Sequence, residues 1–158
     1  MAWVGVWTLL LAALLVVERP LLRASFFHNS VLLDPFIRMS KTVILLAGGA
    51  VLVIGMGYMK QEQINAFEYI VLILFSILGM LFLVSSQDLI TFYLAIEMQR
   101  LSLYALAAFK RDSAFSTEAG LKYFILGALS SGLLLLGASL LYGFTGTTNF
   151  SEMATFFA

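Results

Sequence analysis

Apolar residues gather in five long runs that are separated by short polar stretches. The runs cover residues 2–18, 42–59, 67–84, 89–109 and 118–144, and the mixed stretch 19–41 is interrupted by Pro20 and Pro35. Because an α-helix rises about 1.5 Å per residue, about 20 apolar residues cross the hydrocarbon core of a bilayer. The pattern therefore predicts an all-α, polytopic transmembrane bundle of about five helices in one domain, residues 1–158, with an interfacial linker at 19–41.

The composition agrees with a membrane protein. Of the 158 residues, 61% are hydrophobic and 11% are charged, whereas a soluble domain carries roughly 25% charged residues. The net charge of zero argues against nucleic acid as a partner. The chain has no cysteine and one histidine, so cysteine catalysis is excluded and no metal or haem site is predicted within it.

The run 89–109 carries polar side chains near its middle. Tyr93, Glu97, Arg100 and Tyr104 follow one another at i, i+4, i+7 and i+11, which places them in one stripe along a helix. An ionised side chain in the bilayer core costs at least about 2.5–3.5 kcal/mol. The stripe is therefore expected to face protein or water rather than lipid.

Two interpretations of this stripe are open. In the functional one, Glu97 is a titratable proton carrier, and Arg100, Tyr93 and Tyr104 modulate it. In the structural one, Glu97 and Arg100 neutralise each other at i, i+3 and hold two helices together. The functional interpretation is favoured, because a helix built only for packing could use Ser or Thr at these positions.

The run 118–144 carries a second charged pair, Lys122 with Glu118 one turn before it. Snorkelling to the adjacent polar loop would explain Lys122 as well as a functional role would. Small residues four apart in the same run, such as Gly127 and Ser131, allow a neighbouring helix to approach closely. Burial disfavours the charged forms of both carboxylate and amine, so a Glu–Lys pair can exchange a proton near neutral pH. We therefore expect Glu97 to face Lys122 across this contact.

Other polar residues are given structural roles. His28 is interpreted as an interfacial residue and Asp88 as a helix cap. Glu68 lies in the first turn of its run, where a carboxylate suits the helix dipole. Ser116 or Thr117 is predicted to cap the last run.

Two motifs are too specific for a generic hydrophobic pattern. They are YLAIE at residues 93–97 and STEAGLKYFILGA at residues 116–128. With them, the segment 61–150 resembles the central part of NADH dehydrogenase subunit 2, an antiporter-like membrane subunit of respiratory complex I. The five runs would then correspond to the second to sixth helices of that family.

This resemblance implies a function. Glu97 matches an essential glutamate of the family and Lys122 a lysine on its next helix, and both belong to a chain of charged residues that carries protons. The chain would be a non-redox subunit of proton-translocating NADH:ubiquinone oxidoreductase. It would hold no cofactor, because NADH, FMN, iron–sulfur clusters and quinone bind other subunits.

This chain differs from the family that it resembles in its length and at one residue of the polar stripe. Its members are much longer, so a fragment or a split-gene product is expected, with another chain supplying the later helices. The other partners would be complex I membrane subunits and lipid. Arg100 stands where the family has a small polar residue, and a cation there would hold Glu97 ionised.

Alternatives to the proton-translocating subunit remain open. One is a structural or assembly fragment with no proton role, and the other is a subunit of a related multisubunit cation/proton antiporter. The resemblance implies the mitochondrial inner membrane, with a bacterial plasma membrane as the alternative location.

Overall fold

The computed structural model of the chain describes residues 2–18, 24–26, 30–61 and 66–158. Six helices and one short hairpin are present among them. The helices are α1 (Ala2–Glu18), α2 (Pro35–Gln61), α3 (Ala66–Ser85), α4 (Leu89–Ala107), α5 (Ala114–Thr145) and α6 (Phe150–Phe157), and strands β1 (Ala24–Phe26) and β2 (Val31–Leu33) form the hairpin. His28 and Pro20 lie outside the described residues.

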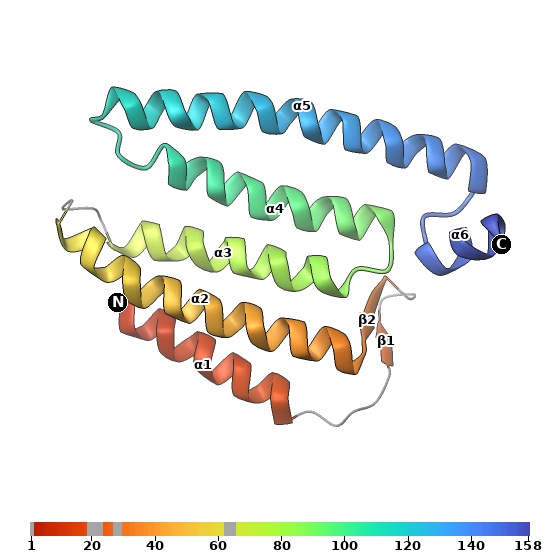
Figure 1. Cartoon of the computed structure of the whole chain (residues 1–158), viewed down its shortest axis with the longest axis horizontal. Helices are drawn as coiled ribbons and strands as arrows, with labels where there is room; N and C mark the ends of the chain where they lie inside the picture. Colours follow the sequence, from red (N-terminus) through yellow and green to blue (C-terminus); the bar gives the residue numbers. More distant parts are fainter. Residues whose placement is uncertain (1, 19–23, 27–29, 62–65) are drawn as a thin grey trace.

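The five long helices lie side by side in chain order, and each runs opposite to the one before it (Figure 1). α2 packs against α1 and α3, α3 packs against α4, and α4 packs against α5. The short α6 turns back near the end of α5. The predicted all-α transmembrane bundle is confirmed.

The hydrophobic core lies among the first three long helices. Leu52 of α2 is fully buried there, with Leu9 of α1 and Ile77 of α3 in the same cluster. Gly48 permits this packing, because a Cβ at that position would lie 2.5 Å from Ile77 Cδ1. α1, α2 and α3 therefore form a packed unit, and α4 packs against its α3 side.

A second glycine fixes how α4 lies on α3. A Cβ at Gly79 would lie 2.8 Å from the backbone nitrogen of Gln99 and 3.0 Å from the carbonyl oxygen of Ala95. The face of α4 that contains Ala95 and Gln99 is therefore pressed against α3. Glu97 and Arg100 lie on another face, which is free to meet α5.

Three of the described helices are long and apolar enough to cross a membrane, namely α2, residues 67–85 of α3, and α5. α1 is apolar but has 17 residues. α4 has 19 residues, and the charges of Glu97 and Arg100 reduce its hydropathy. The five predicted runs all form helices, but α4 needs protein beside its polar face in order to lie in a bilayer.

Several predicted boundaries were wrong. α2 begins at Pro35 rather than near residue 42, since proline favours the first helical position, and the hairpin occupies part of the predicted linker. α4 ends at Ala107 rather than Phe109. Ser113, rather than Ser116 or Thr117, caps α5, which therefore begins at Ala114. The tail after Thr145, predicted to be only a polar end, contains α6.

Asp88 caps α4, as predicted, and also ties it to the segment before α6. Its Oδ1 accepts hydrogen bonds from the backbone nitrogens of Ile90 at 2.7 Å and Thr91 at 3.4 Å. Its Oδ2 accepts a hydrogen bond from Thr148 Oγ1 at 2.6 Å. The Asp88 carboxylate thus connects the start of α4 to the loop before α6.

We expect Asp88→Ala to lower the free energy of unfolding by about 1–2 kcal/mol, because the helix loses its cap. Thermal unfolding of the detergent-solubilised complex that contains the chain measures the loss. Asp88→Asn is the matched control, since asparagine caps helices about as well as aspartate. Equal losses in the two variants would show that the cap does not account for the effect.

Candidate functional site

The candidate site lies where α5 packs on α4. The buried residues of α5 are Gly120, Gly127 and Ser131, whose spacing of seven and four places them in one stripe. A Cβ at Gly120 would lie 2.5 Å from the Cβ of Ala108, so α5 is in close contact with the C-terminal end of α4 there. The stripe of small residues predicted in α5 therefore faces α4.

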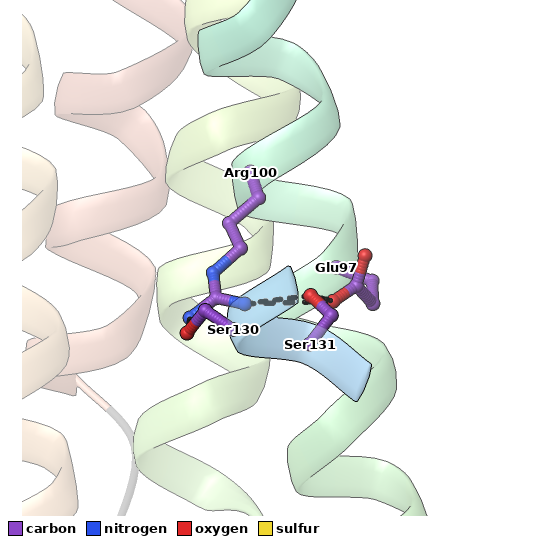
Figure 2. A network of polar contacts seen from close by, with 4 residues as sticks. All are labelled: Glu97, Arg100, Ser130 and Ser131. Carbon is purple, nitrogen blue, oxygen red and sulfur yellow. Dashed lines mark hydrogen bonds and ion pairs between the residues drawn. The ribbon is translucent and has the colours of Figure 1, made fainter. Parts of the chain in front are cut away.

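The polar cluster at this interface contains Glu97, Arg100, Ser130 and Ser131 (Figure 2). Arg100 Nη1 donates a hydrogen bond to Ser131 Oγ at 2.7 Å, and Nη2 donates to Ser130 Oγ at 3.3 Å. The Ser131 hydroxyl donates in turn to Glu97 Oε1. Arg100 Nη1 also lies 3.7 Å from Glu97 Oε1 as an ion pair. A cation, a hydroxyl and a carboxylate are thus connected in sequence.

The two charged side chains of this cluster are partly buried. The side chain of Arg100 is 26% exposed and that of Glu97 is 24% exposed. Neighbouring residues of one helix supply the pair at i, i+3, and the hydroxyls come from the opposite helix. The guanidinium of Arg100 therefore points to Glu97 and the α5 serines, the arrangement expected in the structural interpretation. Proton transfer by Glu97 stays a prediction.

Lys122 is paired elsewhere. Its Nζ donates to Glu118 Oε1 at 2.5 Å, and the two side chains are 71% and 58% exposed. Ser131, which is level with Glu97, lies nine residues further along α5, or about 13 Å along its axis. The predicted direct contact between Glu97 and Lys122 was therefore wrong. The close approach of Gly120 to Ala108 sets a helix register in which Ser131 meets Glu97.

Tyr104 lies between these two charged groups. It is 8% exposed, and its ring packs edge-on against Tyr123 at 4.8 Å and Phe124 at 5.7 Å between ring centres. The ring reaches over Gly127, where a Cβ would lie 1.7 Å from the hydroxyl oxygen. The hydroxyl is buried and makes no hydrogen bond with any described residue. Such an unmade bond costs about 1–3 kcal/mol.

Tyr93, the remaining residue of the stripe, lies outside the cluster. It lines a groove of about 430 Å³ between the start of α4 and the end of α5, together with Tyr142 and Thr148. A second hollow, of about 290 Å³, lies between α3 and α4 and has Glu68 and Arg111 in its lining. Across the described ranges, no group of three metal-ligating side chains is present.

Ser130 and Ser131 are the site residues that sequence reasoning missed. The sequence pattern assigns Ser131 only a packing role, as a small residue, and assigns Ser130 none. Their hydroxyls were a signal, since an adjacent serine pair lies on a helix whose neighbour carries two charges. Sequence could not show the helix register that brings these hydroxyls to Glu97 and Arg100.

A family model for the transmembrane part of NADH:quinone oxidoreductase and Mrp antiporters matches residues 86–158. NADH-ubiquinone oxidoreductase chain 2 of Marchantia polymorpha is 53% identical over 98% of this chain and 32% of its own length. NADH-quinone oxidoreductase subunit N of Azorhizobium caulinodans is 50% identical over 92% of this chain and 31% of its own length. The predicted resemblance to NADH dehydrogenase subunit 2 is confirmed.

Solved structures agree with this family resemblance. A chain of respiratory complex I from Thermus thermophilus superposes with a TM-score of 0.78 at 29% identity, over 94% of this chain and 32% of that chain. A chain of the archaeal membrane-bound sulfane sulfur reductase shares the fold, with a TM-score of 0.72 at 22% identity. This chain thus spans about one third of the length of the chain 2 and subunit N relatives that it matches. The predicted location, the mitochondrial inner membrane or a bacterial plasma membrane, fits the sources of these relatives.

Proposed function

We propose that this chain forms part of a membrane-arm subunit of proton-translocating NADH:ubiquinone oxidoreductase and contributes to its proton path. The observation that carries the proposal is the partly buried carboxylate of Glu97, which lies halfway along a helix of membrane-crossing length. This carboxylate forms an ion pair with Arg100 and accepts a hydrogen bond from Ser131. This cluster lies in the segment that the family model matches. A carboxylate at that depth is costly, which favours a functional reason for it.

The cluster can hold Glu97 in either protonation state. With Glu97 ionised, the Ser131 hydroxyl donates to the carboxylate while it accepts from Arg100. With Glu97 protonated, the hydroxyl can turn and accept from the carboxylic acid, because a serine oxygen has two acceptor sites. Arg100 keeps its bonds to Ser130 and Ser131 in both states. A proton can therefore arrive and leave without breaking the helix contact.

Lys122 is proposed as the second proton carrier, with Glu118 as its immediate partner. The exposure of this pair supports access from the surface of the described part of the chain. Its separation from Glu97 along α5 requires an intermediate group or water between the two. The chain itself is proposed to be a non-redox subunit, with NADH, FMN, iron–sulfur clusters and quinone held by other subunits.

Two alternatives have specific support. The ion pair between Glu97 and Arg100 favours a structural fragment in which the charges only hold α4 to α5. The family description, which covers Mrp antiporters as well as the oxidoreductase, favours a subunit of a cation/proton antiporter. In either case, other membrane subunits or lipid would cover the apolar outer face of α5, where Leu126, Leu129 and Leu133 are exposed.

Mass spectrometry of the complex that purifies with this chain tests the proposed class. We expect redox subunits of NADH dehydrogenase, together with a chain that supplies the later helices of the antiporter-like fold. A complex that contains only antiporter subunits would favour the cation/proton antiporter instead. Recovery of the chain without any other membrane subunit would contradict both.

A further inference from the structure

The hollow between the start of α3 and the end of α4 takes no part in the proposed proton path. Its volume is about 290 Å³, its walls are apolar side chains of both helices, and its two charged lining residues are Glu68 and Arg111. The start of α3 and the end of α4 lie at the same end of the bundle (Figure 1). The hollow therefore lies at the height where the headgroups of a membrane meet its hydrocarbon core.

Small side chains of α4 create the space in this hollow. Ala105 and Ala108 both line it and are three residues apart, so they share one face of the helix. The ring of Phe109, another lining residue, packs edge-on against Tyr69 of α3 at 5.4 Å between ring centres. The volume is near the lower end for small-molecule pockets, roughly 300 Å³. The hollow thus has room for one segment of a chain molecule.

Opposite charges line the hollow without neutralising each other. Glu68 lies in the first turn of α3, and Arg111 follows the end of α4. Both side chains are exposed, and within the described ranges they form no ion pair with each other. The hollow therefore suits a ligand that carries both an anion and a cation, attached to an apolar chain.

A phospholipid headgroup supplies this combination of charges. A guanidinium binds a phosphate through two parallel N–H bonds, which assigns the phosphate to Arg111. A primary ammonium has three N–H donors, which assigns it to the carboxylate of Glu68. Val71 and Leu72, one turn further along α3, are apolar wall for an acyl chain.

We propose that this hollow binds phosphatidylethanolamine, whose headgroup joins a phosphate to a primary amine. Phosphatidylglycerol offers Arg111 the same phosphate but has no cation for Glu68. The quaternary ammonium of phosphatidylcholine has no N–H to donate to that carboxylate. The site does not depend on the proposed proton path, since it requires only that the chain lies in a membrane.

Photochemical crosslinking of the complete complex tests the site. The complex is reconstituted in phosphatidylcholine vesicles with a trace of lipid that has a diazirine on its acyl chain and either an ethanolamine or a glycerol headgroup. After illumination, mass spectrometry of peptides measures the lipid adducts on residues 67–72 and 105–109. We expect about threefold more adducts from phosphatidylethanolamine than from phosphatidylglycerol, the preference that an exposed ion pair provides.

Substitutions in the hollow separate its two charges from its shape. Glu68→Gln should abolish the preference, because both lipids still reach Arg111. Arg111→Gln should lower the adducts from both lipids, and Ala105→Leu should do so by filling the hollow. Lys60→Gln and Asp112→Asn are the controls, because each removes an exposed charge from the same end of the bundle outside the hollow. Neither control should change the adducts.

Three results would overturn the site. Absence of lipid adducts at these residues in the wild-type complex would show that another subunit covers the hollow. Equal adducts from the two lipids, or more from phosphatidylglycerol, would contradict the assigned headgroup. A preference retained in assembled Glu68→Gln complex would show that the carboxylate does not select the lipid. The comparison of the two lipids in the wild-type complex needs no variant, so it decides even where a substitution lowers assembly.

Discussion

Replacing Glu97 with glutamine is expected to reduce proton pumping and coupled NADH:ubiquinone oxidoreductase activity by about 100-fold while the complex still assembles. Glutamine has nearly the size of glutamate and keeps a carbonyl oxygen that can accept from the Ser131 hydroxyl. It cannot release or bind a proton at physiological pH. Packing between α4 and α5 should therefore survive, and the proton step should not. Proton uptake by membrane vesicles and native gel electrophoresis measure the two properties separately.

A matched control for the Glu97 prediction is Glu152→Gln in α6. Glu152 accepts a hydrogen bond from the Thr147 hydroxyl, as Glu97 does from Ser131, but it is exposed and lies outside the α4–α5 interface. We expect that variant to pump at the wild-type rate. Wild-type pumping by assembled Glu97→Gln complex would contradict the proton path.

Loss of assembly in Glu97→Gln would support the structural alternative. The same loss would also follow if the unpaired charge of Arg100 destabilised the variant, so the two explanations need separate tests. The substitution leaves the Arg100 guanidinium, 26% exposed, without its counter-ion. An uncompensated charge in this position is destabilising by itself. The double variant Glu97→Gln, Arg100→Gln removes both charges and leaves polar groups that can still bond the serines. Restored assembly without restored pumping in the double variant would agree with a proton role for Glu97.

The helices of the fold could be predicted because each apolar run is long and the membrane demands internal hydrogen bonding. The helix ends were less predictable, because they depend on local capping. α2 begins at Pro35, earlier than the apolar pattern indicates, and Ser113 rather than Ser116 is the N-cap of α5. The short hairpin gave no clear signal, since three-residue strands contain too few positions to show alternation.

For the site, sequence could identify the polar face of α4 but not its partners. The face follows from helical periodicity, so Glu97, Arg100 and Tyr104 were correctly placed together. Which residue of α5 contacts them depends on the register of α5 relative to α4. Contacts such as that of Gly120 with Ala108 set this register. A shift of about two and a half turns along α5 would be needed to bring Lys122 level with Glu97, and periodicity within one helix carries no information about it.

Gly127→Ala is expected to give the largest structural defect of any single methyl group added to α5. The new Cβ would lie 1.7 Å from the Tyr104 hydroxyl oxygen and 2.5 Å from Cζ. The ring cannot easily move aside, because Tyr123 and Phe124 pack against it edge-on. Overpacking of this kind costs about 1–3 kcal/mol or more. We expect α5 to separate from α4 and the amount of assembled complex on native gels to fall several-fold.

Gly132→Ala is the matched control for Gly127→Ala, five residues along the same helix. A Cβ at Gly132 meets no described atom within 4 Å, and alanine is the better helix former, so assembly should be unchanged or improved. Removing the ring provides the compensating test. Gly127→Ala combined with Tyr104→Leu should recover much of the assembled complex, whereas Gly127→Ala with Tyr104→Phe should not, because Cζ remains too close. Equal assembly of Gly127→Ala and wild type would contradict the close contact of α4 with α5, and with it the register on which the placement of Glu97, Tyr104 and Lys122 depends.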